Sequence, residues 1–143
     1  MLNKVGFDWS TRMKSQFPSA QEYSAETARH PPLAVVDIRA EQIAVTESYS
    51  NHVLVDVNTN CMRLAVFEGE YRWHHHPDSD ELFLVVAGTL QIDLLGGYCI
   101  ELTEWQSVVI PTGTVHRTRA IGRTVNITYE KNGAQTVFVE NAV

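Results

Sequence analysis

The sequence lacks a long apolar run, and its longest, Leu82–Ala87, has only six residues. A helix needs roughly 20 apolar residues to span a bilayer, so we expect no membrane contact. Runs of like charge are also missing, and the formal net charge is −6. Because nucleic acids and anionic membranes attract basic surfaces, this charge balance argues against either of them as a partner.

The N-terminus also lacks the apolar stretch and small-residue cleavage site of a secretory signal, so we predict a cytoplasmic protein. Cysteine is scarce: Cys61 and Cys99 are the only two. Both fall inside predicted strands. In a reducing compartment we expect two half-buried thiols, although a disulfide between them stays open as an alternative.

What the sequence does contain, from Leu33 onward, is a series of period-two apolar patterns. Turn signals such as Gly96-Gly97 and Asn132-Gly133 separate them. The predicted strands are 33–38, 43–46, 53–57, 61–67, 73–76, 81–87, 89–94, 98–102, 107–110, 117–120, 124–130 and 136–140. Many short strands with closely spaced turns predict an all-β sandwich or barrel.

Residues 1–32 differ from the rest and predict a helical extension. Asp8 could cap a short helix that runs through Ser15, and Ser19–Glu22 is a capping-box pattern that opens a second helix before Pro31-Pro32. A chain of 143 residues suggests one domain. We therefore predict an N-terminal extension over residues 1–32, packed on the outside of a barrel domain formed by residues 33–143.

Three histidines and one glutamate stand at spacings that predict a metal site. His74 and His76 are two residues apart, so both side chains leave the same face of one strand. Glu81 follows a turn and can lie across the hairpin from them. His116 ends a Pro-x-Gly turn, which would aim it back at the sheet. We predict that these four side chains bind one divalent metal ion per chain.

Two rivals for this ligand set remain open. Asp80 could replace Glu81, although strand alternation favours Glu81 because it places Phe83 and Val85 on the same inner face. His75 should point to the outer face, away from the other histidines. We expect His30 and His52, which stand in polar loop-like stretches, to be solvated.

These segments resemble the two short motifs of the cupin superfamily. In the first motif, a His-x-His pair is followed by a glutamate and then a glycine, and His74, His76, Glu81 and Gly88 keep this spacing. Gly69, which would lead the motif, is one residue closer to His74 than in the usual pattern.

Pro111-x-Gly113-x-x-His116 matches the centre of the second motif. Its flanks differ, because Trp105 stands where the motif has glycine and Ala120 where it has asparagine. The resemblance spans residues 53–130 and is closest to the small single-domain cupins of uncharacterised function. It implies an all-β, jelly-roll-like cupin β-barrel that carries the short helical extension.

The ligand types allow several metals. Neutral imidazoles and one carboxylate leave a divalent ion with about +1 net charge and, at six-coordination, two open positions. Iron(II), manganese(II) and nickel(II) suit this set, and zinc also fits. Arg63 or Arg119 could pair with a substrate carboxylate. The expected pocket lining is Arg63, Phe83, Gln91, Val109 and one alternation of Asn126, Thr128 and Glu130, while Trp73 and Trp105 either wall the pocket or fill the barrel end.

The apolar outer face of the strand predicted over 81–87 indicates that another part of the chain or a second copy covers it. Leu82, Leu84 and Val86 form an outward row as apolar as the inward one, so either the N-terminal extension or a second copy should cover it. Cupins often pair through such sheets, and we predict a homodimer.

Three functions fit this sequence. The first is a metal-dependent enzyme that acts on a small oxygenated molecule by oxygenation, isomerisation or hydrolysis, and we favour the dioxygenase or isomerase type. The alternatives are a non-catalytic cupin that binds a small ligand and a structural cupin whose metal only stabilises the barrel.

Overall fold

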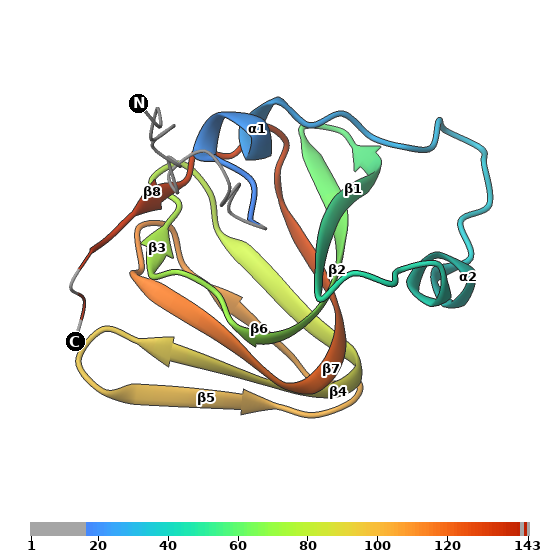
Figure 1. Ribbon diagram of the computed structural model, residues 1–143. Helices are drawn as coiled ribbons and strands as arrows, with labels where there is room; N and C mark the ends of the chain where they lie inside the picture. The colour runs from blue at the N-terminus through green and yellow to red at the C-terminus, as the bar shows by residue number, and fades with distance from the viewer. Residues whose placement is uncertain (1–16, 141, 143) are drawn as a thin grey trace, which may run out of the picture.

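The computed structural model describes residues 17–140 and 142, which form a strongly curled β-sheet with two short helices (Figure 1). The predicted all-β fold with short helices near the N-terminus is confirmed. The helices are α1 (Ala20–Ala25) and α2 (Ile38–Ile43). The strands of the described residues are β1 (Tyr49–Val57), β2 (Asn60–Glu70), β3 (His74–His75), β4 (Glu81–Leu94), β5 (Tyr98–Leu102), β6 (Ser107–Ile110), β7 (His116–Lys131) and β8 (Val137–Phe138).

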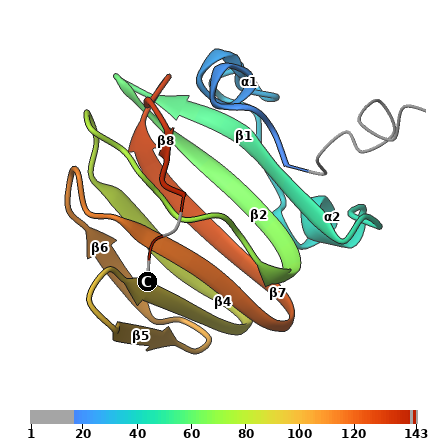
Figure 2. The ribbon, with the colours of Figure 1, turned by 60° about the vertical axis from the view of Figure 1, so that its left-hand side comes forward.

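The sheet is built around the long antiparallel pair β4 and β7. Strand β2 pairs with the other edge of β7, β1 pairs with β2, and β5 and β6 pair with β4 (Figure 2). Two irregularities interrupt the β4–β7 register, between Val85 and Ala87 and between Ala87 and Thr89. Bulges of this kind bend strands, and both strands turn there.

This bend sets the geometry of the interior. In the β4–β7 ladder Glu81 pairs with Glu130, whereas His116 pairs with Leu94 at the opposite end. Because the two strands fold back on themselves, these two ends face each other across the interior. Two residues at the opposite ends of one ladder, Glu81 and His116, can therefore meet.

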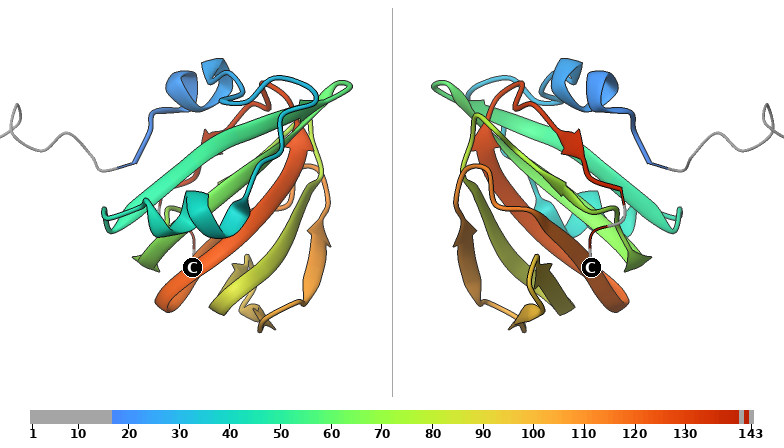
Figure 3. Two further views of the ribbon diagram at one scale, coloured as in Figure 1. Left: turned by 90° about the vertical axis from the view of Figure 1, so that its right-hand side faces the viewer. Right: turned by 90° about the vertical axis from the view of Figure 1, so that its left-hand side faces the viewer.

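Two apolar clusters stabilise the fold. The inner cluster fills the corner of the curled sheet and includes Val85, Leu90 and Ile92. The outer cluster lies on the other face of the sheet, where Val36 and Ile38 pack against Val125 and its neighbours (Figure 3). The chain between α1 and β1 thus covers part of the outward apolar row.

The predicted strands at 33–38 and 43–46 are wrong. Asp37 caps α2 instead, since its Oδ1 accepts hydrogen bonds from the backbone N–H groups of Arg39 (2.9 Å) and Ala40 (3.2 Å). The alternation of apolar and polar residues predicts a strand here, but the Asp37 cap starts a helix instead. The strand pairs 81–87/89–94 and 117–120/124–130 are each one bent strand, because Gly88 and Gly122 lie in bends and not in terminal turns.

The helix predicted after Ser19 is confirmed, and the Ser19 Oγ accepts a hydrogen bond from the Glu22 backbone N–H at 3.1 Å. It ends at Ala25, before the prolines that were expected to stop it. The helix predicted from Asp8 to Ser15 lies outside the described residues. Among the described residues, no helix is long and apolar enough to cross a membrane. The division at residue 32 stays a prediction.

Candidate metal centre

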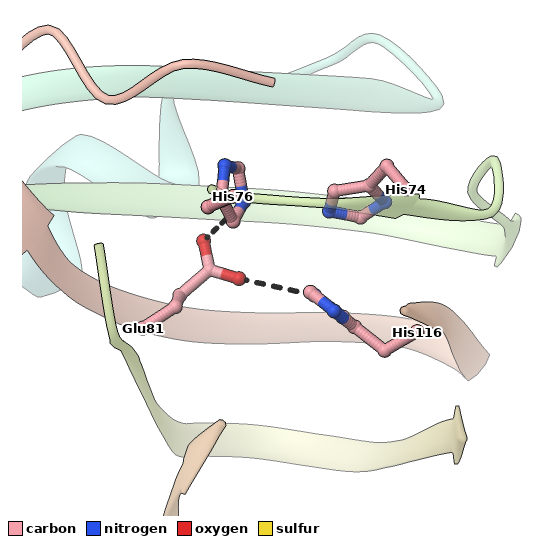
Figure 4. A group of neighbouring side chains, drawn as sticks. All are labelled: His74, His76, Glu81 and His116. Carbon is pink, nitrogen blue, oxygen red and sulfur yellow. Dashed lines mark hydrogen bonds and ion pairs between the residues drawn. The ribbon is translucent and has the colours of Figure 1, made fainter. Parts of the chain in front are cut away.

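Strand pairing brings the predicted ligands to one point. Strand β3 pairs with β7 through His74 and His116, and His74 also pairs with Phe138 of β8. The turn after β3 is held by Asp80, whose Oδ1 accepts hydrogen bonds from both the backbone N–H and the hydroxyl of Thr112, each at 2.8 Å. Glu81 then opens β4 with its side chain directed inward (Figure 4).

His74, His76, Glu81 and His116 are all buried, and one ligand atom from each lies within 4.8 Å of the others. The Glu81 carboxylate is central, with Oε1 3.3 Å from His116 Nε2 and Oε2 3.5 Å from His76 Nε2. The structure thus gathers the four side chains that the sequence singled out. Their role as ligands stays a prediction.

Each histidine is oriented by the backbone. The Nδ1 atoms of His74, His76 and His116 lie 2.7–2.8 Å from the carbonyl oxygens of Arg72, Gln135 and Thr114. A carbonyl only accepts, so each Nδ1 carries a proton and each Nε2 faces the cluster. Partners of this kind are what metal-ligating histidines use to fix ring orientation, and the donor set therefore fits a divalent ion.

Burial and mutual charge polarise the cluster. Burial, aided by the charge of His116, lowers the pKa of His74 to about 3. Burial would also lower the pKa of His76, but the hydrogen bond and charge of Glu81 outweigh it and raise that pKa to about 9. Burial opposes ionisation of Glu81, yet hydrogen bonds with His116 and His76 lower its pKa well below the ordinary value. The ionised Glu81 carboxylate thus stabilises a proton on His76, and a bound cation would replace that proton.

A second polar group adjoins the cluster. Glu130 Oε1 accepts a hydrogen bond from the Tyr23 hydroxyl and lies 3.1 Å from Arg63 Nε, while Glu130 Oε2 lies 3.9 Å from His76 Nε2. Burial and the charge of Glu81 raise the pKa of Glu130 to about 8.

Tyr23 connects the N-terminal extension to the cluster. It is the one buried residue of α1, its ring stacks on that of His76 with centroids 5.9 Å apart, and the Arg63 guanidinium lies 3.7 Å from its centre. The capping box predicted the helix but carried no signal for its contact with His76. Only the position of α1 over the open end of the sheet shows it (Figure 3).

A cavity of about 40 Å³ lies beside the cluster. His74, His76 and Glu81 form part of its wall, and aromatic and small polar side chains form the rest. The other lining residues are Tyr23, Tyr49, Asn51, Ala65, Phe67, Tyr71, Phe83, Thr118, Asn126, Thr128 and Thr136. The cluster therefore borders a space of the size of a few small polar groups.

The lining agrees in part with the sequence-based expectation. Phe83, Asn126 and Thr128 line the cavity, whereas Gln91 bonds to Glu101 and Val109 is half exposed on the surface. Trp73 is not among the described residues that line it, and Trp105 is 72% exposed, so neither expectation for Trp105 holds.

Neither arginine is free for a substrate carboxylate. Arg63 is 2% exposed and is held between Glu26 and Glu130, and both Arg117 and Arg119 bind Asp93 on the surface. These ion pairs already engage the guanidinium groups.

The remaining titratable candidates also lie elsewhere. Asp80 and His75 are outside the four-residue cluster. His30 and His52 lie beside Glu41 and Glu26, and their side chains are 29% and 40% exposed to solvent. Cys61 is buried, Cys99 is exposed, and both are free thiols.

Backbone conformation explains the glycine at position 88 and is also unusual at Trp105, where the second motif has glycine. Gly88 has φ +86°, and a Cβ there would lie 2.7 Å from Thr124 Oγ1 and 2.8 Å from the Arg123 carbonyl oxygen. Trp105, which stands where the second motif has glycine, has φ +67°. The left-handed turn is thus kept without the glycine that usually supplies it. Ala120, in place of asparagine, is buried in the inner cluster.

Comparison with known proteins places this geometry in a family. The model of the cupin domain family matches residues 61–128. The uncharacterized protein YdbB of Bacillus subtilis (strain 168) is 52% identical over 96 residues, which is 67% of this chain and 85% of YdbB.

Two solved structures illustrate the shared fold. A cupin-2 domain containing protein from Shewanella frigidimarina is 31% identical with a TM-score of 0.64, over 68% of this chain and 94% of that one. An uncharacterized conserved protein with a double-stranded β-helix domain from Klebsiella pneumoniae has a TM-score of 0.63 at 16% identity, over 75% of this chain and 97% of that one. Motifs, fold and relatives agree that the chain belongs to the cupin family.

Proposed function

We propose that this cupin is a divalent-metal-dependent enzyme of the oxygenase or isomerase type that acts on a small oxygenated molecule. The observation that carries this proposal is the cavity beside the four-residue cluster. A structural metal site is closed by protein ligands, whereas a catalytic one keeps a position open for water or substrate. Here three of the four side chains border the cavity.

The residues have distinct tasks in this proposal. His74, His76, Glu81 and His116 would hold the ion, and the Nδ1 hydrogen bonds keep the three rings in place. A bound divalent ion would supply Lewis-acid activation of a substrate oxygen. Phe83 and Tyr71 help to exclude water from the cavity, and Tyr23 closes it from the side of α1.

Structural neighbours show that related folds serve enzymes. An oxalate oxidase solved in complex with glycolate has a TM-score of 0.55 at 19% identity, and a DMSP lyase from Ruegeria pomeroyi has 0.54 at 20%. At these identities the likeness concerns the fold, so it leaves the reaction of this chain open between oxygenation and isomerisation.

The first test is the metal content of protein purified without an affinity tag or chelator. One ion of iron, manganese, nickel or zinc per chain supports the proposal. Iron directs the next assays to oxygen consumption with small oxygenated acids, and the other metals direct them to isomerisation. A protein that takes up none of these ions contradicts the proposal and favours a metal-free ligand-binding cupin. If the metal is bound but no small oxygenated molecule binds to it, a structural role for the metal is favoured. The cytoplasmic location stays a prediction.

We also propose that two copies of the chain pair through the outer face of the sheet. A groove of about 710 Å³ lies there, lined among others by Leu84, Val86 and Trp105. Beside it, Leu33 and Val35 are almost fully exposed. Exposed apolar groups at this density are unfavourable in water. The exposed segment leads directly into Val36, which lines the groove, so a two-fold axis can place each segment against the groove of the other copy.

Light scattering tests this pairing. The wild type should have twice the mass of one chain, and Leu84→Glu should have the mass of one chain because it buries a charge in the groove. Val57→Glu is the matched control, since Val57 is exposed near the turn between β1 and β2. A wild type that is monomeric at micromolar concentration would refute the pairing.

A further inference from the structure

A row of polar side chains lies next to the metal-ligand cluster on the inner face of β7. Asn126, Thr128 and Glu130 alternate along the strand, and each is at most 3% exposed. The atoms Asn126 Oδ1, Thr128 Oγ1 and Glu130 Oε2 are buried and have no hydrogen-bond partner among the described residues. Buried polar atoms are normally paired, so three unpaired ones at successive inward positions indicate that a bound molecule completes them.

This polar row faces the same space as the cluster. Asn126 and Thr128 line the cavity with His74, His76 and Glu81, and Glu130 Oε2 is 3.9 Å from His76 Nε2. Among the neighbouring positions on β2 and β4, Ala65 pairs with Asn126 and Phe83 pairs with Thr128, and both are apolar and line the cavity. Thr128 also pairs with Arg63 of β2, which does not line the cavity. A ligand in the cavity would therefore meet hydrogen-bonding groups on the β7 side and apolar groups beside them.

The charges around the cavity limit the ligand further. None of the described residues that line it is lysine or arginine, and Arg63 is already held by Glu26 and Glu130. An anionic group of a ligand can be balanced only at the cluster, where a divalent ion and Glu81 together carry about +1. The groups that reach Asn126 and Thr128 must then be neutral, because both side chains are neutral.

The cavity also limits size. Its volume of about 40 Å³ is that of roughly three or four water-sized groups. A chain of about three carbons fills it when one end is bound at the cluster.

We propose that the polar row recognises the hydroxyl groups of a short hydroxylated monocarboxylate whose carboxylate binds at the metal centre. This inference rests on the proposed function, because it needs the ion to hold the carboxylate. Thr128 and Asn126 are specificity-determining residues in this proposal, since they contact the part of the ligand that is distant from the ion.

The experiment is isothermal titration of the metal-loaded protein with propionate, lactate and glycerate. These three-carbon monoanions differ only in carrying no, one or two hydroxyl groups. The 2-hydroxyl reaches the ion, whereas the 3-hydroxyl reaches the polar row. Glycerate should bind about tenfold more tightly than lactate, the gain expected of one buried hydrogen bond.

Variants separate this contact from a general effect on the fold. Thr128→Val and Asn126→Leu should each bring the ratio of the affinities for glycerate and lactate close to one. Thr128→Ser, which keeps the hydroxyl, should keep the wild-type ratio. Thr124→Val is the matched control on the same strand, because its hydroxyl already bonds to the carbonyl oxygens of Thr89 (3.0 Å) and Gly122 (3.2 Å). It should keep the preference even if it lowers stability.

The possible outcomes are distinct. Equal affinity for the three acids, or a glycerate preference that survives both Thr128→Val and Asn126→Leu, would refute recognition of the ligand by the polar row. The measured metal content would in that case still support the metal centre. A protein without metal uptake would overturn the proposed function, and this inference with it.

Discussion

The two ends of the sheet interior have opposite characters although the same strands build both. At the corner where β4 and β7 bend, Val85, Leu90 and Ile92 have no exposed surface. At the open end, Glu81, His116 and Glu130 are just as deeply buried but ionisable. Burying apolar surface stabilises a fold, whereas burying ionisable groups costs free energy unless they are paired. The corner therefore stabilises the protein, and the open end uses part of that stability to hold the ionisable cluster.

The largest effect that tests this difference is expected when a predicted ligand at the open end is removed. His76→Ala should weaken metal binding by at least about 100-fold, because losing even an outer partner of a ligand costs 10- to 100-fold. The variant should stay folded, since the apolar corner is untouched. Elemental analysis and circular dichroism measure the two properties.

Arg119→Ala serves as the control, because Arg119 binds Asp93 on the surface and should leave metal content unchanged. If His76→Ala retained its full metal content, the ligand assignment would be wrong.

The converse change is made at the corner. Leu90→Ala removes a completely buried side chain and should lower the free energy of unfolding by about 2–5 kcal/mol. Denaturant titration measures this loss. Metal bound per folded chain should be that of the wild type, and a parallel loss of metal would show that the two ends are not separable.

A smaller effect is expected from the bend itself. Gly88→Ala places a Cβ against Thr124 and Arg123 at a positive φ, and it should cost about 1–3 kcal/mol of unfolding free energy. Gly96→Ala is the matched control, because Gly96 has φ +100° but a Cβ there would meet no heavy atom of the described residues within 4 Å.

Thermal unfolding of both variants separates the cost of backbone strain from the cost of the contact between a Cβ at position 88 and β7. If the two glycine variants were equally stable, the contact between β4 and β7 at the bend would not limit the residue at position 88.

The smallest effect concerns the outer surface. Arg119, and after it Arg117, hold the pKa of Asp93 below its usual range. A lowered pKa contributes stability above the unfolded pKa of about 3.9, and this contribution is lost as the pH falls toward the folded value. Asp93→Asn should therefore be about 0.2–1 kcal/mol less stable than the wild type at pH 7, the range of surface ion pairs.

That difference should shrink below about pH 4, as followed by denaturant titration across pH. A constant difference down to pH 2 would mean that the ion pairs do not set the pKa of Asp93. Neither end of the interior should respond to this substitution.

Much of the strand pattern and the composition of the cluster could be predicted. Alternation correctly placed Glu81, Phe83 and Val85 inward and Leu82, Leu84 and Val86 in the less buried row. Local spacing suffices for this, because successive side chains of a strand point to opposite faces. The α2 segment is not predictable in this way, because six residues offer too little periodicity to distinguish a helix from a strand.

The sequence by itself determined which residue types can form a metal centre, because His-x-His, the following glutamate and the Pro-x-Gly turn are local patterns. Only the tertiary structure decided that they meet. The ladder partners of Glu81 and His116 lie at opposite ends of β4 and β7, and the bend closes that distance. It also decided that Tyr23 of the extension stacks on His76 and that Asn126 and Thr128 remain unpaired beside the centre. Contacts between segments so far apart in the chain depend on how the sheet curls, and no local pattern records that curvature.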